Sequence, residues 1–279
     1  MLTAQEHLGA TARGVTSPQL FRADDGRVYV VKLQNNRLGP KVLANEFIAA
    51  RLGEDLGLCF PPGGVIKLGE TVRKRSGRLA RVAPGRHFAS RYLSGAEYLR
   101  PHNIGRAVNR AEMAGVMLLD HLGHNLDRTL NRRNLLLRRE ADGWRIYAID
   151  NSHFFRRALW TEETLARLAP RIRVNGHGAF GTLLRHYLEP ADFAPYLSRV
   201  QGWSDDFLAG VVAGVPAEWL PHAAEREAVV GFLRARRDLA AEIVTCLTAM
   251  IPAGQHATRP KPPERHRISV RFRPFRLAR

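Results

Sequence analysis

The feature that most constrains this chain is a pair of apolar runs separated by one turn signal. The first run is Asn-Leu-Leu-Leu at 134–137, the second is Trp-Arg-Ile-Tyr-Ala-Ile-Asp at 144–150, and Ala-Asp-Gly occupies 141–143 between them. Asp-Gly between two such runs predicts a β-hairpin. If the loop is 141–143, with its glycine left-handed, the numbers of paired residues sum to 284 and Asn134 lies opposite Asp150. An amide oxygen and a carboxylate then converge at the open end of the hairpin.

Asp127 lies in the loop that leads into the first of these strands, so its carboxylate can reach the same place. Phosphoryl transfer needs a carboxylate that orients or deprotonates the acceptor hydroxyl, and oxygen ligands that hold Mg²⁺ against the phosphates. We therefore predict that Asp127 is the catalytic carboxylate and that Asn134 and Asp150 are metal ligands. Asn131 is the alternative amide ligand, and we favour Asn134 because it adjoins the apolar strand.

A second group of candidate residues precedes the hairpin by about 100 positions. Residues 28–33 follow an Asp-Asp-Gly turn and are rich in β-branched side chains, which predicts a strand. Gly39-Pro40 then opens a predicted helix over residues 41–56. We predict that Lys32 on the strand reaches the α- and β-phosphates of ATP and is held by an ion pair with Glu46 on the helix. The resulting order Lys, Glu, Asp, Asn, Asp is that of kinases.

The remaining pattern predicts an α+β chain. The first 100 residues combine short strand-like runs with one helix, and Phe88 to Leu93 is a further extended segment near a predicted cleft. The chain from about residue 105 is dominated by helical periodicity. Helices are predicted at 107–122, 161–169, 180–187, 204–213 and 225–250.

The charge of the chain favours anionic partners. The formal net charge is +17, and residues 252–279 contribute +7 of it, from eight Lys or Arg against Glu264 alone. Nucleotides, nucleic acid and acidic protein surfaces all suit this surplus, which does not choose among them. In this basic tail Arg271-Phe-Arg-Pro-Phe-Arg alternates cations with aromatic rings, a pattern that stacks on bases or docks on acidic grooves. The alternative interpretation is a solvated tail with little capacity to form a core.

Other classes of protein are disfavoured by the sequence. No apolar run approaches the roughly 18–20 residues of a membrane span, and the first residues lack a secretory signal. Cys59 and Cys246 lie in apolar surroundings without CxxC spacing, which is typical of reduced cysteines in a cytosolic protein. His121 and His124 have no third ligand at a recognisable spacing, so we interpret them as helix-end and core histidines.

Taken together, the motifs resemble the HipA-like kinase family, a bacterial branch of the protein-kinase-like fold, over most of residues 10–250. The motifs that resemble it are Gly14-Val-Thr-Ser-Pro, Tyr29-Val-Val-Lys-Leu, Asn45-Glu46, Asp120-His-Leu with Asn125-Leu-Asp127-Arg128, Asn134-Leu-Leu-Leu and Ile149-Asp150-Asn151. The resemblance implies a bilobal fold, with a smaller mixed β/α N-lobe at 1–98 and a mainly helical C-lobe at 99–251. Residues 252–279 form a separate basic tail.

The resemblance also implies a nucleotide site. A loop over the ATP phosphates, which satisfies their oxygens through backbone N–H groups, is formed by Gly14, Thr16 and Ser17. The segment that joins the lobes beside adenine runs from Phe88 through Ser90 to Tyr92. Arg128 either holds the catalytic loop or pairs with an acid.

The sequence therefore predicts a cytoplasmic phosphotransferase that uses ATP and Mg²⁺ to phosphorylate a hydroxyl acceptor. The family resemblance implies a protein Ser or Thr as acceptor, and a small molecule stays open. Residue 132 is arginine where protein kinases place the metal-binding asparagine, and Asn151-Ser152 follows Asp150 where many kinases have glycine. These departures leave a rival open, a kinase-like scaffold that holds nucleotide without efficient turnover and docks on nucleic acid or protein. A nucleic-acid-binding protein whose tail carries the affinity ranks last, because no nucleic-acid-binding motif is visible.

Overall fold

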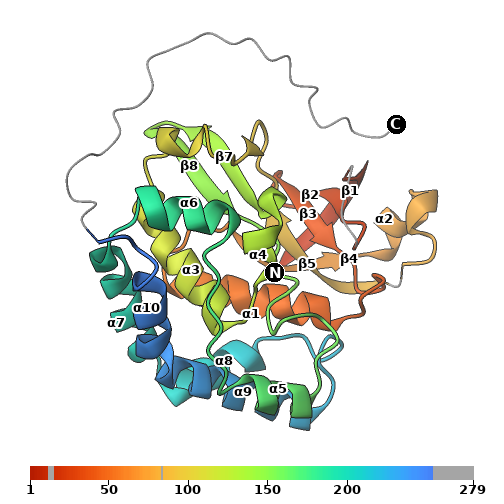
Figure 1. Cartoon of the computed structure of the whole chain (residues 1–279). Helices are drawn as coiled ribbons and strands as arrows, with labels where there is room; N and C mark the ends of the chain where they lie inside the picture. Colours follow the sequence, from red (N-terminus) through yellow and green to blue (C-terminus); the bar gives the residue numbers. More distant parts are fainter. Residues whose placement is uncertain (12–15, 83, 254–279) are drawn as a thin grey trace.

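The computed structural model describes residues 1–11, 16–82 and 84–253, and contains two separate β-sheets (Figure 1). Five strands form a closed barrel in the order β1-β2-β3-β5-β4, and three form a sheet in the order β6-β7-β8. The barrel strands are β1 (Leu2–Ala10), β2 (Gln19–Ala23), β3 (Val28–Lys32), β4 (Gly63–Leu68) and β5 (Gly85–Arg91). The strands of the second sheet are β6 (Glu97–Tyr98), β7 (Leu135–Glu140) and β8 (Gly143–Ala148).

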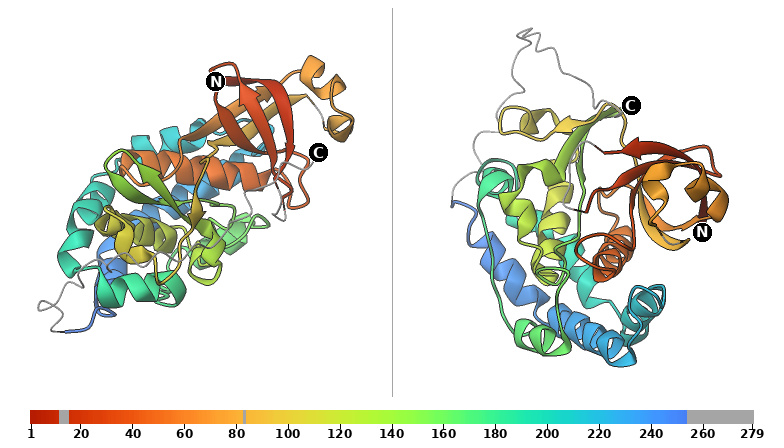
Figure 2. Two further views of the ribbon diagram at one scale, coloured as in Figure 1. Left: turned by 90° about the horizontal axis from the view of Figure 1, so that it is seen from above. Right: turned by 90° about the vertical axis from the view of Figure 1, so that its right-hand side faces the viewer.

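Most of the helical residues follow the barrel in the sequence. The α-helices are α1 (Lys41–Asp55), α2 (Glu70–Lys74), α3 (Met113–Leu122), α4 (Asp127–Leu130), α5 (Glu162–Leu168), α6 (Gly178–His186), α7 (Ala194–Gln201), α8 (Asp205–Ala213), α9 (Ala223–Asp238) and α10 (Ala240–Thr248). The 3₁₀ turns are η1 (Gly77–Leu79), η2 (Ile104–Arg106), η3 (Arg110–Glu112), η4 (Arg132–Asn134) and η5 (Pro190–Phe193). Both views place α1 between the barrel and the later helices (Figures 1 and 2).

The barrel has its own hydrophobic core. Successive side chains of a strand point to opposite faces, so Tyr29 and Val31 of β3 pack inside the barrel with Phe21 and Ile66. Lys32 falls on the other face of the same strand. It therefore projects out of the barrel, where α1 lies.

Helix α1 is buried on almost every side. It contacts β4 and β5 of the barrel and also α3 and α8, and Val42, Leu43 and Ile48 are completely inaccessible to solvent. A helix enclosed in this way offers no exposed face for polar side chains. Asn45 and Glu46 are nevertheless buried in its middle, so both need polar partners from neighbouring segments.

Several predicted elements are confirmed. The strand at 28–33 is β3, the helix at 41–56 is α1, and the helices expected at 161–169, 180–187 and 204–213 are α5, α6 and α8 within one or two residues. Strand β1 was not predicted. It pairs antiparallel with β2, so Thr16 and Ser17 lie in the connection between the two strands of the first hairpin. Gly14 itself lies outside the described residues, as does the basic tail from residue 254 onward.

The predicted register of the β7–β8 hairpin is wrong by one residue. Leu135 pairs with Ala148 and Glu140 pairs with Gly143, so paired numbers sum to 283 and the loop is only Ala141-Asp142. The cause is the glycine, whose φ of +136° lets it join the ladder instead of the loop. Asn134 consequently faces Ile149, whose N–H donates to the Asn134 carbonyl at 3.0 Å, and does not face Asp150.

The helix predicted at 107–122 begins later, with η3 and then α3 at Met113. Asn109 explains the delay, because its side chain donates to the Ile146 carbonyl at 3.0 Å and accepts from the Ile146 N–H at 2.8 Å. Ala107 forms a bridge with Trp144 on the same strand. Residues 107–109 therefore extend the edge of the second sheet.

The single helix predicted at 225–250 is two helices. Leu239, with φ −87° and ψ 2°, ends α9 and begins α10. The break allows α9 to pack on α5 and α8 while α10 packs on α3 and α7. Within the described residues, no helix has both the length and the apolar character needed to cross a membrane.

His121 and His124 are both buried at the end of α3. The Nδ1–H of His121 donates to the Met117 carbonyl at 2.6 Å, and its Nε2 accepts the N–H of Asn175 at 3.0 Å, so the ring is neutral. Burial lowers the pKa of His121 to about 4. Burial and the nearby charge of Arg236 lower the pKa of His124 to about 3.

We predict that the free energy of unfolding falls as the pH drops below 6.5. The unfolded histidines bind protons at an ordinary pKa near 6.5 and the folded ones do not, so stability is complete above that pH and is lost toward the folded values. Each histidine contributes about 2 kcal/mol of this loss between pH 7 and pH 5.

Urea unfolding of the wild type and of His124→Asn at these two pH values measures the effect. Asparagine suits the φ of +50° at this position. The stability difference between pH 7 and pH 5 should be smaller in the variant. An equal difference would contradict the assignment.

Candidate active site

Three charged side chains from distant parts of the chain meet at the exit of β3. The Lys32 ammonium donates to Asp150 Oδ1 at 2.7 Å and also to Glu46 Oε1, so the predicted ion pair between Lys32 and Glu46 is present. The side chains of Lys32 and Glu46 are 9% and 4% exposed, whereas that of Asp150, just after β8, is 38% exposed. In this charged triad, Lys32 and Glu46 are therefore buried, and the carboxylate of Asp150 is accessible to solvent.

Within the triad, Lys32 and Asp150 hold their charges strongly. Burial alone would lower the pKa of Lys32, but the carboxylates of Asp150 and Glu46 raise it above its ordinary value. Burial opposes ionisation of Asp150, yet the adjacent Lys32 ammonium lowers the pKa of Asp150 well below its usual range. Burial raises the pKa of Glu46, which Lys32 offsets in part. Two carboxyl groups share one ammonium, so the open side of the triad is suited to a cation.

Helix α1 also anchors the backbone that follows Asp150. Glu46 Oε1 accepts the N–H of Asn151 at 3.0 Å. The side-chain amide of Asn45 donates to the carbonyls of Ser152 at 2.9 Å and Phe154 at 2.7 Å. These bonds satisfy the two buried polar residues of α1 and fix the segment after Asp150 at the same time.

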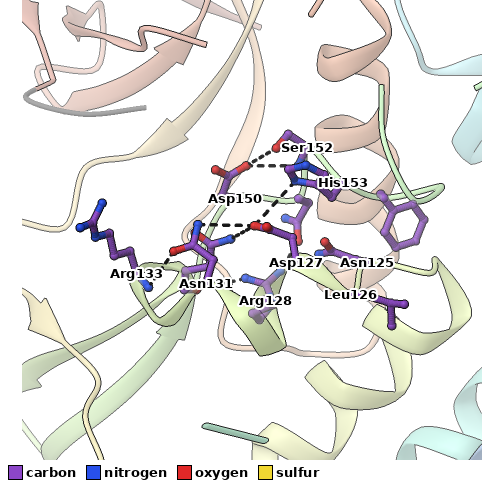
Figure 3. A network of polar contacts seen from close by, with 12 residues as sticks. Asn125, Leu126, Asp127, Arg128, Asn131, Arg133, Asp150, Ser152 and His153 are labelled. Atoms are coloured by element: carbon purple, nitrogen blue, oxygen red, sulfur yellow. Dashed lines mark hydrogen bonds and ion pairs between the residues drawn. The ribbon is translucent and has the colours of Figure 1, made fainter. Parts of the chain in front are cut away.

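Asp127 begins α4 and lies in a second polar group beside the triad (Figure 3). Its Oδ2 accepts from the side-chain amide of Asn134 at 2.7 Å, and that of Asn131 is 3.5 Å away. His153 Nδ1 lies 3.7 Å from the same oxygen. Because His153 is three residues after Asp150, this contact brings the predicted catalytic carboxylate, Asp127, near the predicted metal-binding carboxylate, Asp150.

The two candidate amide ligands differ in what their oxygens do. Asn131 Oδ1 accepts the backbone N–H of Arg133 at 3.2 Å and so caps the η4 turn. The side-chain NH₂ group of Asn134 donates to Asp127, and Asn134 Oδ1 accepts no hydrogen bond within the described part of the chain. The amide oxygen of Asn134 is therefore the one that remains open to a ligand.

Arg128 joins the segment that carries Asp127 to the two strand termini at the open end of the β7–β8 hairpin. It is completely buried and pairs with Asp120, with Nε 2.7 Å from Oδ2. The same guanidinium donates to the carbonyl oxygens of Asn134, at 3.1 Å, and Ile149. It also donates to Asn151 Oδ1 at 2.5 Å. Both predicted uses of Arg128, pairing with an acid and holding the loop, are present in one side chain.

Comparison with known families identifies this arrangement. The family model described as HipA-like kinase matches residues 5–241, which is most of the chain. The chain belongs to the HipA-like kinase family. It is therefore a kinase-type phosphotransferase, in agreement with the resemblance seen in its motifs. No curated protein sequence matches it significantly.

Solved kinase structures share the fold of this HipA-like kinase at low sequence identity. The Helicobacter pylori proinflammatory kinase CtkA is 10% identical, with a TM-score of 0.56 over 86% of this chain and 94% of CtkA. The Golgi casein kinase with Mn/ADP bound is 10% identical, with a TM-score of 0.52 over 92% and 75% of the two chains. Hydra Fam20 with sugar is 11% identical, with a TM-score of 0.53 over 89% and 86%. At these identities the likeness establishes a kinase-like fold alone.

The predicted phosphate loop of this HipA-like kinase connects β1 and β2. Thr16 is buried, and Ser17 adopts a left-handed φ of +47° while its carbonyl accepts the side chain of Gln19 at 2.8 Å. The third predicted member, Gly14, is outside the described residues. Thr16 and Ser17 thus lie in the connection between β1 and β2, and β2 pairs in turn with β3, the strand that carries Lys32.

The predicted adenine segment lies on and just after β5. In the β3–β5 ladder, Phe88 pairs with Lys32 and Ser90 pairs with Val30. The Phe88 ring is buried in the cluster around α1, whereas Ser90 and Tyr92 are partly exposed. The strand that carries Lys32 therefore has this segment as its direct neighbour.

Sequence reasoning missed the contributions of Ser152 and His153. The Ser152 hydroxyl donates to Asp150 Oδ1 at 2.6 Å, and His153 contacts Asp127. The available signal was only their position immediately after Asp150-Asn151. Nothing in the sequence shows that the chain folds back over Asp127 at this point.

We predict that Arg128→Met destabilises the protein by about 3–5 kcal/mol, because it leaves the buried carboxylate of Asp120 without its counter-ion. The double variant Arg128→Met/Asp120→Asn should recover part of the loss, since the asparagine removes the charge and still accepts from Asn125. Urea denaturation of the wild type, both single variants and the double variant gives the coupling energy. A loss below about 1 kcal/mol in Arg128→Met would show that the pair is not structurally required.

Proposed function

We propose that this HipA-like kinase uses ATP and Mg²⁺ to transfer the γ-phosphate to the hydroxyl of a protein Ser or Thr. The observation that supports this most is the charged triad of Lys32, Glu46 and Asp150, joined through the segment after Asp150 to Asp127. Phosphoryl transfer is catalysed mainly by positioning and charge stabilisation. A buried cation and an open carboxylate held by three rigid elements provide both.

Lys32 is the proposed ligand of the α- and β-phosphates. Its high pKa keeps the ammonium charged, and Glu46 fixes its direction from inside α1. In the kinase arrangement the backbone of the β1–β2 connection, with Gly14, Thr16 and Ser17, closes over the phosphates. Phe88, Ser90 and Tyr92 border the adenine in this proposal.

Asp150 and Asn134 are the proposed magnesium ligands. A carboxylate and an amide oxygen are the hard oxygen donors that Mg²⁺ prefers, and neither Asp150 Oδ2 nor Asn134 Oδ1 accepts a hydrogen bond from the described residues. When bound, the metal neutralises charge on the phosphates. The Golgi casein kinase, with Mn/ADP bound, supports the use of a nucleotide with a divalent cation. Asn131 fits less well, because its oxygen caps η4.

Asp127 is the proposed catalytic carboxylate. Asn134 and His153 lie against its Oδ2, and its Oδ1 accepts no hydrogen bond from the described residues. That oxygen is free to orient the acceptor hydroxyl and to take its proton. Arg128 acts on the reaction only through the loop that it holds.

We infer two lobes from the same arrangement, 1–98 around the barrel and 99–251 around the helices, with residues 252–279 as a tail that contacts acidic protein or nucleic acid. The separate hydrophobic cluster inside the barrel supports the division.

We also infer a cytoplasmic setting, since both cysteines are free. Burial raises the pKa of the Cys59 thiol to about 12, which makes it unreactive.

We predict that Asp127→Ala and Asp150→Ala each reduce Mg²⁺-dependent phosphate transfer from ATP by at least about 10²-fold while the fold remains intact. Labelled ATP, with the protein alone and with cell lysate, measures transfer, and circular dichroism monitors the fold. Asp142→Ala, at the exposed hairpin turn, is the matched control and should leave transfer unchanged. Undiminished turnover in either site variant would refute its assigned role. Thermal stabilisation of the wild type by ATP and Mg²⁺ without any transfer would favour the scaffold alternative.

Alanine variants of the two candidate amide ligands, Asn134 and Asn131, should differ in how their activity depends on Mg²⁺ concentration. Asn134→Ala should raise the Mg²⁺ concentration for half-maximal activity by about 10-fold or more, because it removes a ligand oxygen. Asn131→Ala should change stability more than metal affinity, because it removes the cap of η4. Activity titrated with Mg²⁺ at saturating ATP distinguishes them. The reverse ranking would make Asn131 the ligand.

A further inference from the structure

Three segments of the chain meet beside Asp127 on α4. Residues 131–133 follow α4 directly, and residues 151–160 contact Asp127 through His153. Residues 169–177 reach α4 through Asn175, whose side-chain amide donates to Thr129 Oγ1 at 2.7 Å. These segments therefore border Asp127, the residue that orients the acceptor hydroxyl in the proposed function.

The surface formed by these segments carries a surplus of positive charge that the protein does not neutralise. Its exposed arginines are Arg133, Arg156, Arg157, Arg171 and Arg173, which we call the arginine surface. None of them forms an ion pair with a carboxylate in the parts of the chain that the structure covers, and the three segments contain no Asp or Glu. Some exposed arginines elsewhere do have such partners, as Arg199 with Asp55 and Arg86 with Glu218 show.

The segment that presents Arg156 and Arg157 is rigidly anchored. Phe154 and Phe155 are fully buried, and the Phe155 ring stacks edge-on against Trp160 and Phe232, with centroids 5.7 and 5.2 Å away. Phe155 and Arg156 have positive φ values of +62° and +72°, a strained conformation that persists only where packing imposes it. The two guanidinium groups are thus held outward on a fixed backbone.

The segment that presents Arg171 and Arg173 is held equally firmly. The buried guanidinium of Arg236 donates to the carbonyls of Ala169 at 3.0 Å and Arg171 at 2.6 Å. The same side chain donates to the end of α3 at the carbonyls of His121 and Leu122. Fixed cations reduce the entropy lost when a ligand binds.

The apolar groups on these segments favour a polypeptide over a nucleic acid. Leu130 at the end of α4 and Leu159 in the segment 151–160 are each 71% exposed. The phenylalanine and tryptophan rings of that segment are buried, so they offer no face on which bases can stack. Exposed leucine beside unpaired arginine is the composition of a protein-binding surface.

We propose that the arginine surface binds an Asp/Glu-rich polypeptide segment next to the hydroxyl that is phosphorylated. This inference rests on the proposed function, since it assigns a substrate class to the same site. Carboxylates of the acceptor pair with the guanidinium groups, and its apolar side chains contact the exposed leucines. The basic face makes a basic acceptor segment unfavourable for the same reason.

Fluorescence anisotropy with the full chain, Mg²⁺ and a non-hydrolysable ATP analogue tests the proposal. Two labelled peptides carry one serine, flanked by glutamates in one and by glutamines in the other. The glutamate peptide should bind at least about fivefold more tightly at low salt and lose this advantage as salt rises. Arg156→Gln/Arg157→Gln should reduce the advantage about fivefold. Arg75→Gln/Arg81→Gln, which removes two exposed arginines that follow α2 in the chain and belong to none of the three segments, should not.

Equal binding of the two peptides, or an advantage that survives the Arg156/Arg157 change, would overturn the proposal. Tighter, Arg156/Arg157-dependent binding of a single-stranded oligonucleotide would overturn it in favour of nucleic acid. Transfer to each peptide is measured separately with ATP. Selective binding without transfer would count against the proposed function and leave the docking surface in place, and transfer without selectivity would do the reverse.

Discussion

The pairing of one buried ammonium with two carboxyl groups organises the active site of this kinase. Lys32, Glu46 and Asp150 come from β3, α1 and the end of β8, and each would be costly to bury alone. Removing Lys32 would leave two carboxyl groups without a counter-ion between the barrel and the helices. The triad therefore fixes the relative position of these three elements. The segment that follows Asp150 then links the triad to Asp127 through His153.

Arg128 links the segment around Asp150 to the segment that carries Asp127. Its bonds to Asp120, Asn134, Ile149 and Asn151 make α4, η4 and both ends of the hairpin one unit. Such fully satisfied buried networks rigidify a structure because the low local dielectric strengthens each bond. Asp127 thus sits on a short four-residue helix that could not be stable alone, and the network gives it a defined position.

Family membership and fold account for the chemistry but leave the acceptor undetermined. The chain shares its fold with kinases at 10–11% identity, a level at which function has to be argued from the site. In the proposed function the triad and Asp127 act on the transferred phosphate, which all kinases share. The arginine surface concerns the group that receives it. We propose that selectivity in this enzyme comes from surface cations on a fixed backbone beside the catalytic centre.

The sequence alone determined the elements with strong local signals. Periodicity and turn residues gave β3, α1 and the hairpin, and the chain order of charged residues pointed to Lys32, Glu46, Asp127 and Asp150. Tertiary structure decided the rest. The φ of Gly143 shifted the hairpin register, Asn109 bound to β8 instead of starting a helix, and packing split the last helix at Leu239. The contacts of His153 and Arg128 were likewise decided in space, because pairings across long stretches of chain depend on how the elements pack and have no fixed spacing in sequence.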